Sequence, residues 1–302
     1  MASHSQWILD HLREYDSFLD SLTTIADMGC GASNDIHWWA TLETRDDPPE
    51  PYNYKCYAVD IDQKALNSIP KHENINLINK DFTQENILPR SIDLMLAHDS
   101  FQYAWNPIET LRNWHKAMTV NGMLIISLQA QSGVMDNMYY SFTRDHSIHH
   151  YTPVNLIYML ALCGFDCRDA YLLKKRNDPW INIAVYKNDI EFMDPATTRW
   201  SHLVEKDLVH PSVAESVFKW GDSVKQEEVL YPWLDKENYF IDYQSVFEPL
   251  PFTEGLPVEQ LGGQHKSVEK ESEQSSAFQA DPKNKKTTKT KNVGILRPPK
   301  RG

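Results

Sequence analysis

TIADMGCGASN, residues 24–34, decides the fold of this chain. The first five residues predict a short buried strand, and the glycines at 29 and 31 predict a sharp turn directly after it. Glycine lets the backbone turn tightly and approach a ligand where a Cβ atom would collide. The helix expected next, from about Asn34 to Leu42, would offer free amide N–H groups to an anionic group. The stretch therefore predicts a strand, a loop and a helix that bind a nucleotide-like ligand.

Strands and helices alternate on both sides of this loop. Apolar residues at helical spacing predict a helix over 8–22, and Asn106-Pro107 and Thr152-Pro153 are typical helix starts. Asn121-Gly122 and Gly164 are expected to end these two helices. Short apolar runs predict further strands at 55–59, 75–78, 92–97, 123–128, 168–173 and 180–186. This alternation predicts an α/β fold with a doubly wound, mostly parallel seven-stranded sheet.

The glycine loop differs from two common nucleotide-binding loops. A nicotinamide site requires a third glycine where Asn34 stands, and no Gly-Lys-Ser/Thr follows as in a P-loop. The loop instead resembles the first motif of the class I S-adenosylmethionine-dependent methyltransferases, which reads acid-x-Gly-x-Gly-x-(Gly/Ser). Asp27, Gly29, Gly31 and Ser33 match that motif.

Further stretches follow in the order typical of this family, so that the resemblance extends over about residues 8–187. They are YAVDID at 57–62, KDF at 80–82, IDLMLAH at 92–98, NGMLII at 121–126 and the segment from Tyr151 to Phe165. The resemblance implies a Rossmann-like methyltransferase fold, with S-adenosylmethionine as the cofactor. The residues that it implies for cofactor binding are Asp27, Gly29, Cys30, Gly31, Asp60, Ile61, Asp81, Phe82, His98 and Asp99.

Within this set the resemblance gives individual roles. Asp60 would accept hydrogen bonds from both ribose hydroxyls, as a carboxylate can. Asp81 would meet the adenine amino group and Phe82 would pack beside the ring, while Asp99 or its neighbours would lie near the methyl group. The acids also fit a simpler interpretation, in which they only cap turns or helices.

Methyl transfer mainly requires that donor and acceptor are aligned, and a general base is needed only when the acceptor must lose a proton. Histidine titrates near neutral pH and suits that role. The candidate bases are His98, His146 and His149, of which His98 is the first choice. The alternative is that these histidines are hydrogen-bonded loop residues. A zinc site of His146, His149, His150, Cys163 and Cys167 is disfavoured because Cys-x-x-x-Cys is not a usual structural zinc spacing, so no metal is expected.

Two absences narrow the acceptor. Positions 97–100 read Ala-His-Asp-Ser rather than the Asn/Asp-Pro-Pro-Tyr of enzymes that methylate exocyclic amines, and no Pro-Cys pair offers a nucleophile for a pyrimidine. We therefore expect methylation of an oxygen or nitrogen atom of a small molecule or a protein side chain. The alternative is a catalytically idle interaction protein with a methyltransferase fold, docked into a larger assembly.

Charge and composition divide the chain of 302 residues further. Residues 264–302 carry ten Lys/Arg against four Asp/Glu, a net charge of +6, which leaves −18 for residues 1–263. An acidic body argues against nucleic-acid binding, whereas a basic tail suits weak contact with a polyanion. We expect a methyltransferase domain at 1–188, an aromatic-rich extension at 189–262 that contacts substrate or another subunit, and a disordered tail at 263–302.

The cellular compartment is also predicted from the sequence. The first ten residues do not resemble a signal peptide, and no apolar run is long enough to cross a bilayer. Four cysteines in so long a chain are no disulfide framework, which favours a reducing compartment. We expect a cytoplasmic protein without membrane partners.

Overall fold

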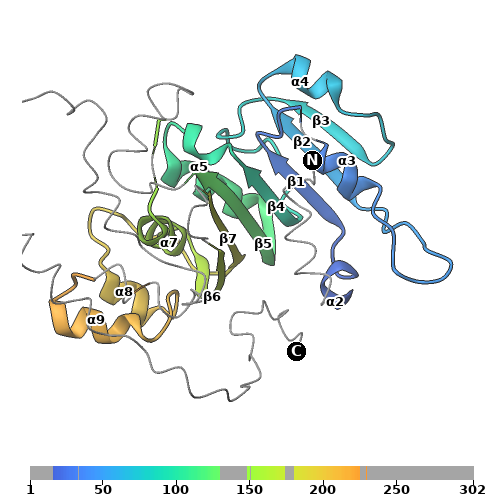
Figure 1. Ribbon diagram of the computed structural model, residues 1–302. Helices are drawn as coiled ribbons and strands as arrows, with labels where there is room; N and C mark the ends of the chain where they lie inside the picture. The colour runs from blue at the N-terminus through green and yellow to red at the C-terminus, as the bar shows by residue number, and fades with distance from the viewer. Residues whose placement is uncertain are drawn as a thin grey trace, which may run out of the picture. The chain divides into compact units, whose positions relative to one another are not determined.

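A seven-stranded sheet of order β3-β2-β1-β4-β5-β7-β6 organises the protein, as the computed structural model shows (Figure 1). The structure describes residues 16–32, 34–129, 148–149, 151–173, 180–224 and 229. The strands are β1 (Thr24–Met28), β2 (Lys55–Asp60), β3 (Ile75–Asn79), β4 (Ile92–His98), β5 (Met118–Gln129), β6 (Phe165–Leu173) and β7 (Trp180–Lys187). The first five strands pair in parallel, and β7 runs antiparallel to both β5 and β6. The predicted doubly wound, mostly parallel sheet is confirmed.

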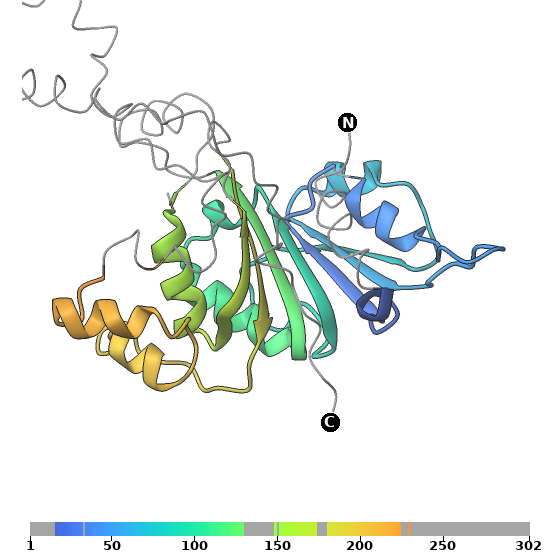
Figure 2. The same ribbon diagram turned by 60° about the horizontal axis from the view of Figure 1, so that its bottom comes forward.

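Helices cover both faces of the sheet. They are α2 (Asp16–Leu19), α3 (Asp35–Ala40), α4 (Gln63–Ser68), α5 (Pro107–Ala117), α7 (Pro153–Leu162), α8 (Trp200–Glu205) and α9 (Val213–Trp220), with a 3-10 turn η1 (Phe101–Tyr103). Trp114 of α5 and Leu160 of α7 belong to one apolar cluster, and Ile36 and Trp39 of α3 belong to the other. Figure 2 shows α7 and α3 on opposite sides of the sheet. The sheet is therefore buried on both faces, as parallel sheets are.

The two predicted helix starts are confirmed by their caps. Asn106 Oδ1 accepts a hydrogen bond from the Glu109 amide at 3.2 Å, with Pro107 in the first turn of α5. Thr152 begins α7 with a capping box that it forms with Asn155. Each cap satisfies amide groups that have no partner within the helix.

The predicted end of α5 at Asn121-Gly122 is wrong. The helix ends at Ala117, and β5 already begins at Met118. The register between β4 and β5 shifts between Ile92, which pairs with Met118, and Leu94, which pairs with Met123. Asn121 has a φ of 64°, so the turn residues lie in an irregular part of a strand and not after a helix.

The structure describes only part of the two ends of the chain. Of the helix predicted over 8–22, the structure describes only α2, and residues 1–15 lie outside the described part. In the extension, Val213–Trp220 form the helix α9, which ends at Gly221 in the left-handed conformation. The remainder of the extension beyond residue 229 and the tail at 263–302 lie outside the described residues. Among the described residues, no helix is both long and apolar enough to cross a membrane.

Candidate active site

The glycine loop joins β1 to α3 and packs against the ends of two neighbouring strands. The amides of Gly29 and Cys30 both donate to the Val59 carbonyl oxygen, at 2.8 and 3.1 Å. Gly29 has a φ of +75°, and a Cβ atom there would lie 2.5 Å from the Ser100 Cβ. Ser100 in turn donates from Oγ to the Met28 carbonyl oxygen at 2.5 Å. Gly29 is therefore required by close packing against the loop after β4, a contact that the sequence did not indicate.

Gly31 lies beside open space. Its φ is +54°, and a Cβ atom built on it would meet no atom within 4 Å. Its amide donates to Asp60 Oδ2 at 2.7 Å, and Asp60 Oδ1 accepts from the Asp62 amide at 2.7 Å. Because each carboxylate oxygen has a second lone pair, Asp60 can still accept hydrogen bonds from ribose hydroxyls. The turn-capping and cofactor-binding interpretations of Asp60 are thus compatible, and the residues fit S-adenosylmethionine.

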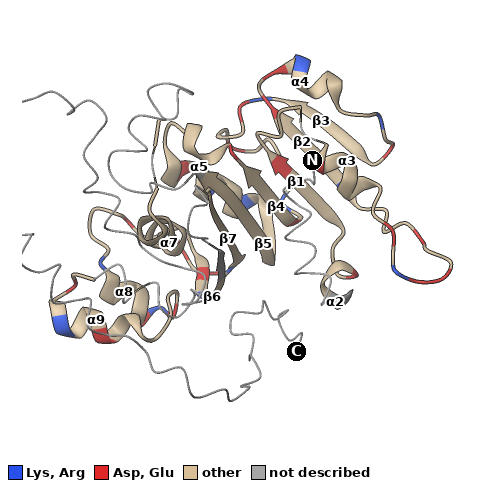
Figure 3. Ribbon diagram, viewed as in Figure 1, with Lys and Arg blue, Asp and Glu red and all other residues tan. Residues whose placement is uncertain are grey.

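The electrostatics of the loop favour a cation. Figure 3 shows acidic residues at the carboxyl ends of β1 and β2. Asp27 is only 3% exposed, and its burial, with the charges of Asp35 and Asp60, raises its pKa to about 8. Moreover, α3 has only six residues and carries Asp35 in its first turn. This differs from the anion-binding loop that the glycines suggested, and it suits a ligand with sulfonium and ammonium charges.

On the other side of the loop, Asp81 and Phe82 follow β3. Asp81 Oδ1 accepts from the amide and the hydroxyl of Thr83, at 2.9 and 2.7 Å, so Asp81 has the turn role that its residue type favours. Phe82 is half-buried against Trp114, with ring centroids 6.0 Å apart, and its Cδ1 would lie 3.4 Å from a Cβ on Gly29. The structure therefore brings Phe82 to the glycine loop, and its packing beside an adenine ring stays a prediction.

Ile61 follows Asp60 and is 73% exposed. An exposed aliphatic side chain offers apolar surface that a bound ring could cover, since burial of apolar surface is favourable. The cofactor role of Ile61 stays a prediction.

His98 and Asp99 lie at the end of β4, next to the glycine loop. The His98 ring stacks on that of Trp180 with centroids 5.1 Å apart. Asp99 has a φ of +49°, its amide donates to the Ser127 carbonyl oxygen at 2.8 Å, and its carboxylate accepts a short hydrogen bond from Gln102 Nε2. Gln102 and Trp180 carry no motif, which is why the sequence did not identify them.

His149 is brought to the same region. The amides of Ile148 and His149 both donate to the Gln102 carbonyl oxygen at 3.1 Å, and His149 Nε2 lies 3.4 Å from the Trp105 carbonyl oxygen. His149 thus lies beside η1, whose Gln102 holds Asp99. The third candidate base, His146, and the motif residue Ser33 lie outside the described residues.

The cysteines of the disfavoured zinc site are core residues. Cys163 and Cys167 are buried, and their thiols donate to backbone carbonyls of Ile108 and Ile157. Burial raises the pKa of Cys163 to about 12, so the thiol stays protonated. In the part of the chain that the structure describes, no three His, Cys, Asp or Glu residues are grouped so as to hold a metal ion.

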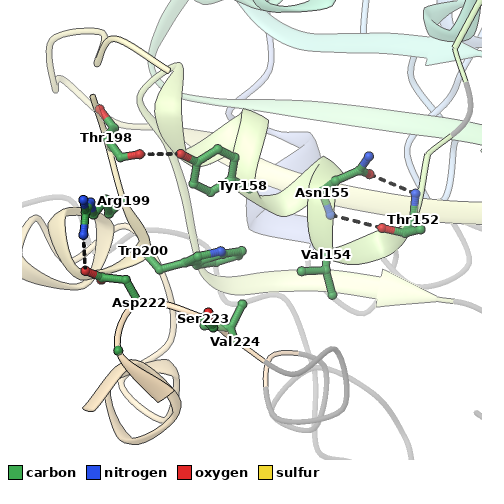
Figure 4. A pocket seen from close by; sticks show the side chains of 11 residues that line it. Thr152, Val154, Asn155, Tyr158, Thr198, Arg199, Trp200, Asp222, Ser223 and Val224 are labelled. Carbon is green, nitrogen blue, oxygen red and sulfur yellow. Dashed lines mark hydrogen bonds and ion pairs between the residues drawn. The ribbon is translucent and has the colours of Figure 1, made fainter. Parts of the chain in front are cut away.

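A cavity of about 590 Å³ lies elsewhere, between α7 and the helices α8 and α9 (Figure 4). None of the residues predicted to bind cofactor lines it. Its polar groups bond to one another: Tyr158 Oη donates to the Thr198 carbonyl oxygen at 2.7 Å, and Arg199 pairs with Asp222 at 3.5 Å. This cavity is therefore a gap between packed helices, and it does not belong to the candidate site.

Comparison with known protein families identifies the domain. A family model described as a methyltransferase domain matches residues 19–188. No curated protein sequence matches the chain.

Solved structures show only distant similarity. An S-adenosylmethionine-dependent methyltransferase from Mesorhizobium loti is 14% identical, with 59% of this chain and 100% of that chain covered and a TM-score of 0.45. For phosphoethanolamine N-methyltransferase 2 from Haemonchus contortus the identity is 12%, the coverage 63% and 54%, and the TM-score 0.48. For human N-acetylserotonin methyltransferase the identity is 18%, the coverage 59% and 50%, and the TM-score 0.45.

Proposed function

The chain belongs to the methyltransferase domain family, and from this we propose that it methylates an oxygen or nitrogen atom of a small molecule or a protein side chain. S-adenosylmethionine is the cofactor of this family and supplies a methyl group that its sulfonium already activates. The task left to the protein is to hold two reactants in line and to manage a proton.

Cofactor binding is assigned to the loops after the first four strands. Asp60 and the open space at Gly31 would take the ribose, with Ile61 and Phe82 on either side of the adenine. Asp27 would face the positive charges of the methionine part, because burial beside Asp35 and Asp60 favours a neutralising cation.

Proton removal is assigned to the end of β4. An acceptor hydroxyl or protonated amine must lose a proton, and a base must lie within hydrogen-bond reach of it. His98 ends β4, Asp99 follows it, and His149 lies beside η1. Of these, His98 is our first choice for the general base, with His149 and His146 as the other candidates.

The observation that carries the proposal is the hydrogen bond from the Gly31 amide to Asp60, at a glycine where an added Cβ atom would meet no described atom within 4 Å. Calorimetry of the full chain with S-adenosylmethionine and its demethylated product tests the cofactor site. We expect the wild-type chain to bind both compounds, and we expect the Asp60→Ala variant to bind both of them more weakly. Absence of binding to the wild-type chain would refute the proposal.

The acceptor class is tested by transfer of labelled methyl groups to a lysate that is separated into small molecules, protein and nucleic acid. We expect the label in the small-molecule or the protein fraction, and a label only in nucleic acid would contradict the proposal. Cofactor binding without transfer to any fraction would instead favour the catalytically idle interaction protein.

A further inference from the structure

We propose that Asn182 of β7 is a positioning residue that accepts a hydrogen bond from the methyl acceptor. The acceptor is then a small molecule with a planar ring and an N–H or O–H group. This inference rests on the proposed methyl transfer and adds the chemistry of the substrate. It begins with a row of polar side chains at the carboxyl edge of the sheet.

Three polar residues share one register row across three strands. His98 of β4 pairs with Ser127 of β5, and Ser127 pairs with Asn182 of β7. Residues in register point to the same face of a sheet. The row two residues deeper along the same strands consists of Leu96, Ile125 and Ala184, which all belong to one apolar cluster.

This polar row lies close to the glycine loop. Asp27 pairs with Leu96 in the deeper row, so the chain two residues after Asp27, at Gly29, reaches the level of His98. The row thus begins where the apolar core ends and extends away from the expected position of the cofactor, over β5 and β7.

The side chain of Asn182 has a buried oxygen atom that no described residue hydrogen-bonds. Asn182 is 4% exposed, and its neighbours Ile181 and Ile183 belong to the apolar cluster on the opposite face. Its Oδ1 is buried and has no hydrogen-bond partner in the described part of the chain. A buried oxygen without a donor costs free energy, and an apolar residue of similar size would avoid that cost. A donor on a bound molecule would satisfy it.

Two stacked rings, those of His98 and Trp180, lie on the same face of the sheet as Asn182 and form a wall there. His98 and Trp180 stack although β5 lies between their strands, whose backbones are about 10 Å apart at the usual spacing of neighbouring strands. The rings therefore lean toward each other over Ser127, whose small side chain is 3% exposed. Aromatic walls of this kind favour a planar ligand, which can stack on them or meet them edge-on.

The distance between Asn182 and His98 favours a small molecule as the methyl acceptor. Asn182 is two strands from His98, so the donor group and the methyl-accepting atom are separated by about 10 Å or less, roughly the length of one substituted ring. Because both Ser127 and Asn182 are more than nine-tenths buried, a free small molecule reaches them more easily than a group attached to a folded protein.

Ligand-observed NMR on the full chain, saturated with S-adenosylhomocysteine, tests the assignment with phenol and toluene as probes of equal size. We expect phenol to bind at least fivefold more tightly than toluene, since only phenol donates to Asn182. Asn182→Leu should reduce this preference to twofold or less, with unchanged affinity for S-adenosylhomocysteine and an equal or higher melting temperature. Asn67→Leu, at an exposed position of α4, is the matched control and should keep the preference.

A second variant tests the same point by strengthening the binding of a probe instead of weakening it. Asn182→Asp keeps the acceptor oxygen and adds a negative charge, so it should bind benzylammonium at least fivefold more tightly than the wild type does. It also carries the test if the leucine variant does not fold.

Equal binding of phenol and toluene to the wild-type chain, or a preference that survives in Asn182→Leu, would overturn the role of Asn182 while cofactor binding stands. Failure of S-adenosylhomocysteine to bind the wild type would overturn the proposed function, and this inference with it.

Discussion

The Gly31 amide donates to Asp60 Oδ2 at 2.7 Å, which ties the glycine loop to the carboxyl end of β2. The same carboxylate accepts from the Asp62 amide, at the start of α4. One side chain thus holds two loops, and its substitution removes both of these hydrogen bonds together with the proposed contact to the ligand.

Asp60→Ala should weaken S-adenosylmethionine binding by roughly 10- to 100-fold, because hydrogen bonds to a charged group contribute about 1.5–3 kcal/mol each. It should also lower the free energy of unfolding, since two backbone amides lose their acceptor. Calorimetry and urea unfolding measure the two effects. Asp62→Ala is the control, because it removes only a helix cap at Lys64 and should leave cofactor affinity within about threefold. Equal cofactor affinity in Asp60→Ala and the wild type would exclude the ribose role.

The two glycines of the loop should respond differently to substitution by alanine. Gly29→Ala combines a positive φ with a contact of 2.5 Å to the Ser100 Cβ, and we expect it to destabilise the fold by about 2–4 kcal/mol. Gly31→Ala meets no atom, so it should cost only about 1–2 kcal/mol for its positive φ. Its methyl group instead enters the expected ligand space and should weaken cofactor binding. Thermal unfolding with and without S-adenosylhomocysteine separates the two effects, and a normal ligand-induced shift in Gly31→Ala would contradict the assignment of that space.

Asp27 should make the stability of the ligand-free protein depend on pH. Its pKa is about 8 in the folded state, whereas the pKa of an exposed aspartate is 3.8. Between these values the folded state binds one more proton than the unfolded state, so the free energy of unfolding falls as the pH rises. The slope is at most about 1.4 kcal/mol per pH unit.

Asp27→Asn should remove this part of the slope between pH 5 and 7 and should be more stable than the wild type at pH 7. Urea unfolding at several pH values measures both effects. An identical pH dependence in the variant and the wild type would show that Asp27 is ionised throughout.

His98→Gln should lower kcat/KM by about 10²- to 10⁴-fold if His98 is the general base, with little effect on S-adenosylhomocysteine affinity. The decrease of kcat/KM at acidic pH, which reflects protonation of the base, should also disappear from the remaining activity. Asn182→Leu serves as the comparison, because it acts on acceptor affinity and should retain that decrease. The assay uses the lysate fraction that accepts label. If His98→Gln retains the pH profile, His98 is not the base, and His149, which lies beside η1, becomes the next candidate.

Much of the fold was predictable because its signals are local. The strand-loop-helix at 24–40 depends on adjacent residues, and so do the caps at Asn106 and Thr152. The prediction that failed, the end of α5 at Asn121-Gly122, also came from local turn residues. There the pairing of β5 with β4 decided the outcome, because a strand can absorb a turn as an irregularity in its register.

The sequence by itself determined the order of the elements, the glycine loop and the acids at the ends of the strands, since apolar period, glycine and acid positions are properties of short segments. Only the tertiary structure decided which distant residues meet. The antiparallel pairing of β7 with β5 places Trp180 against His98, more than 80 residues earlier, and Asn182 in the same register row as His98. The packing of Ser100 on Gly29 closes the loop. Those contacts depend on how strands pair across the sheet, and burial then sets the charge state of Asp27, which no pattern of neighbouring residues encodes.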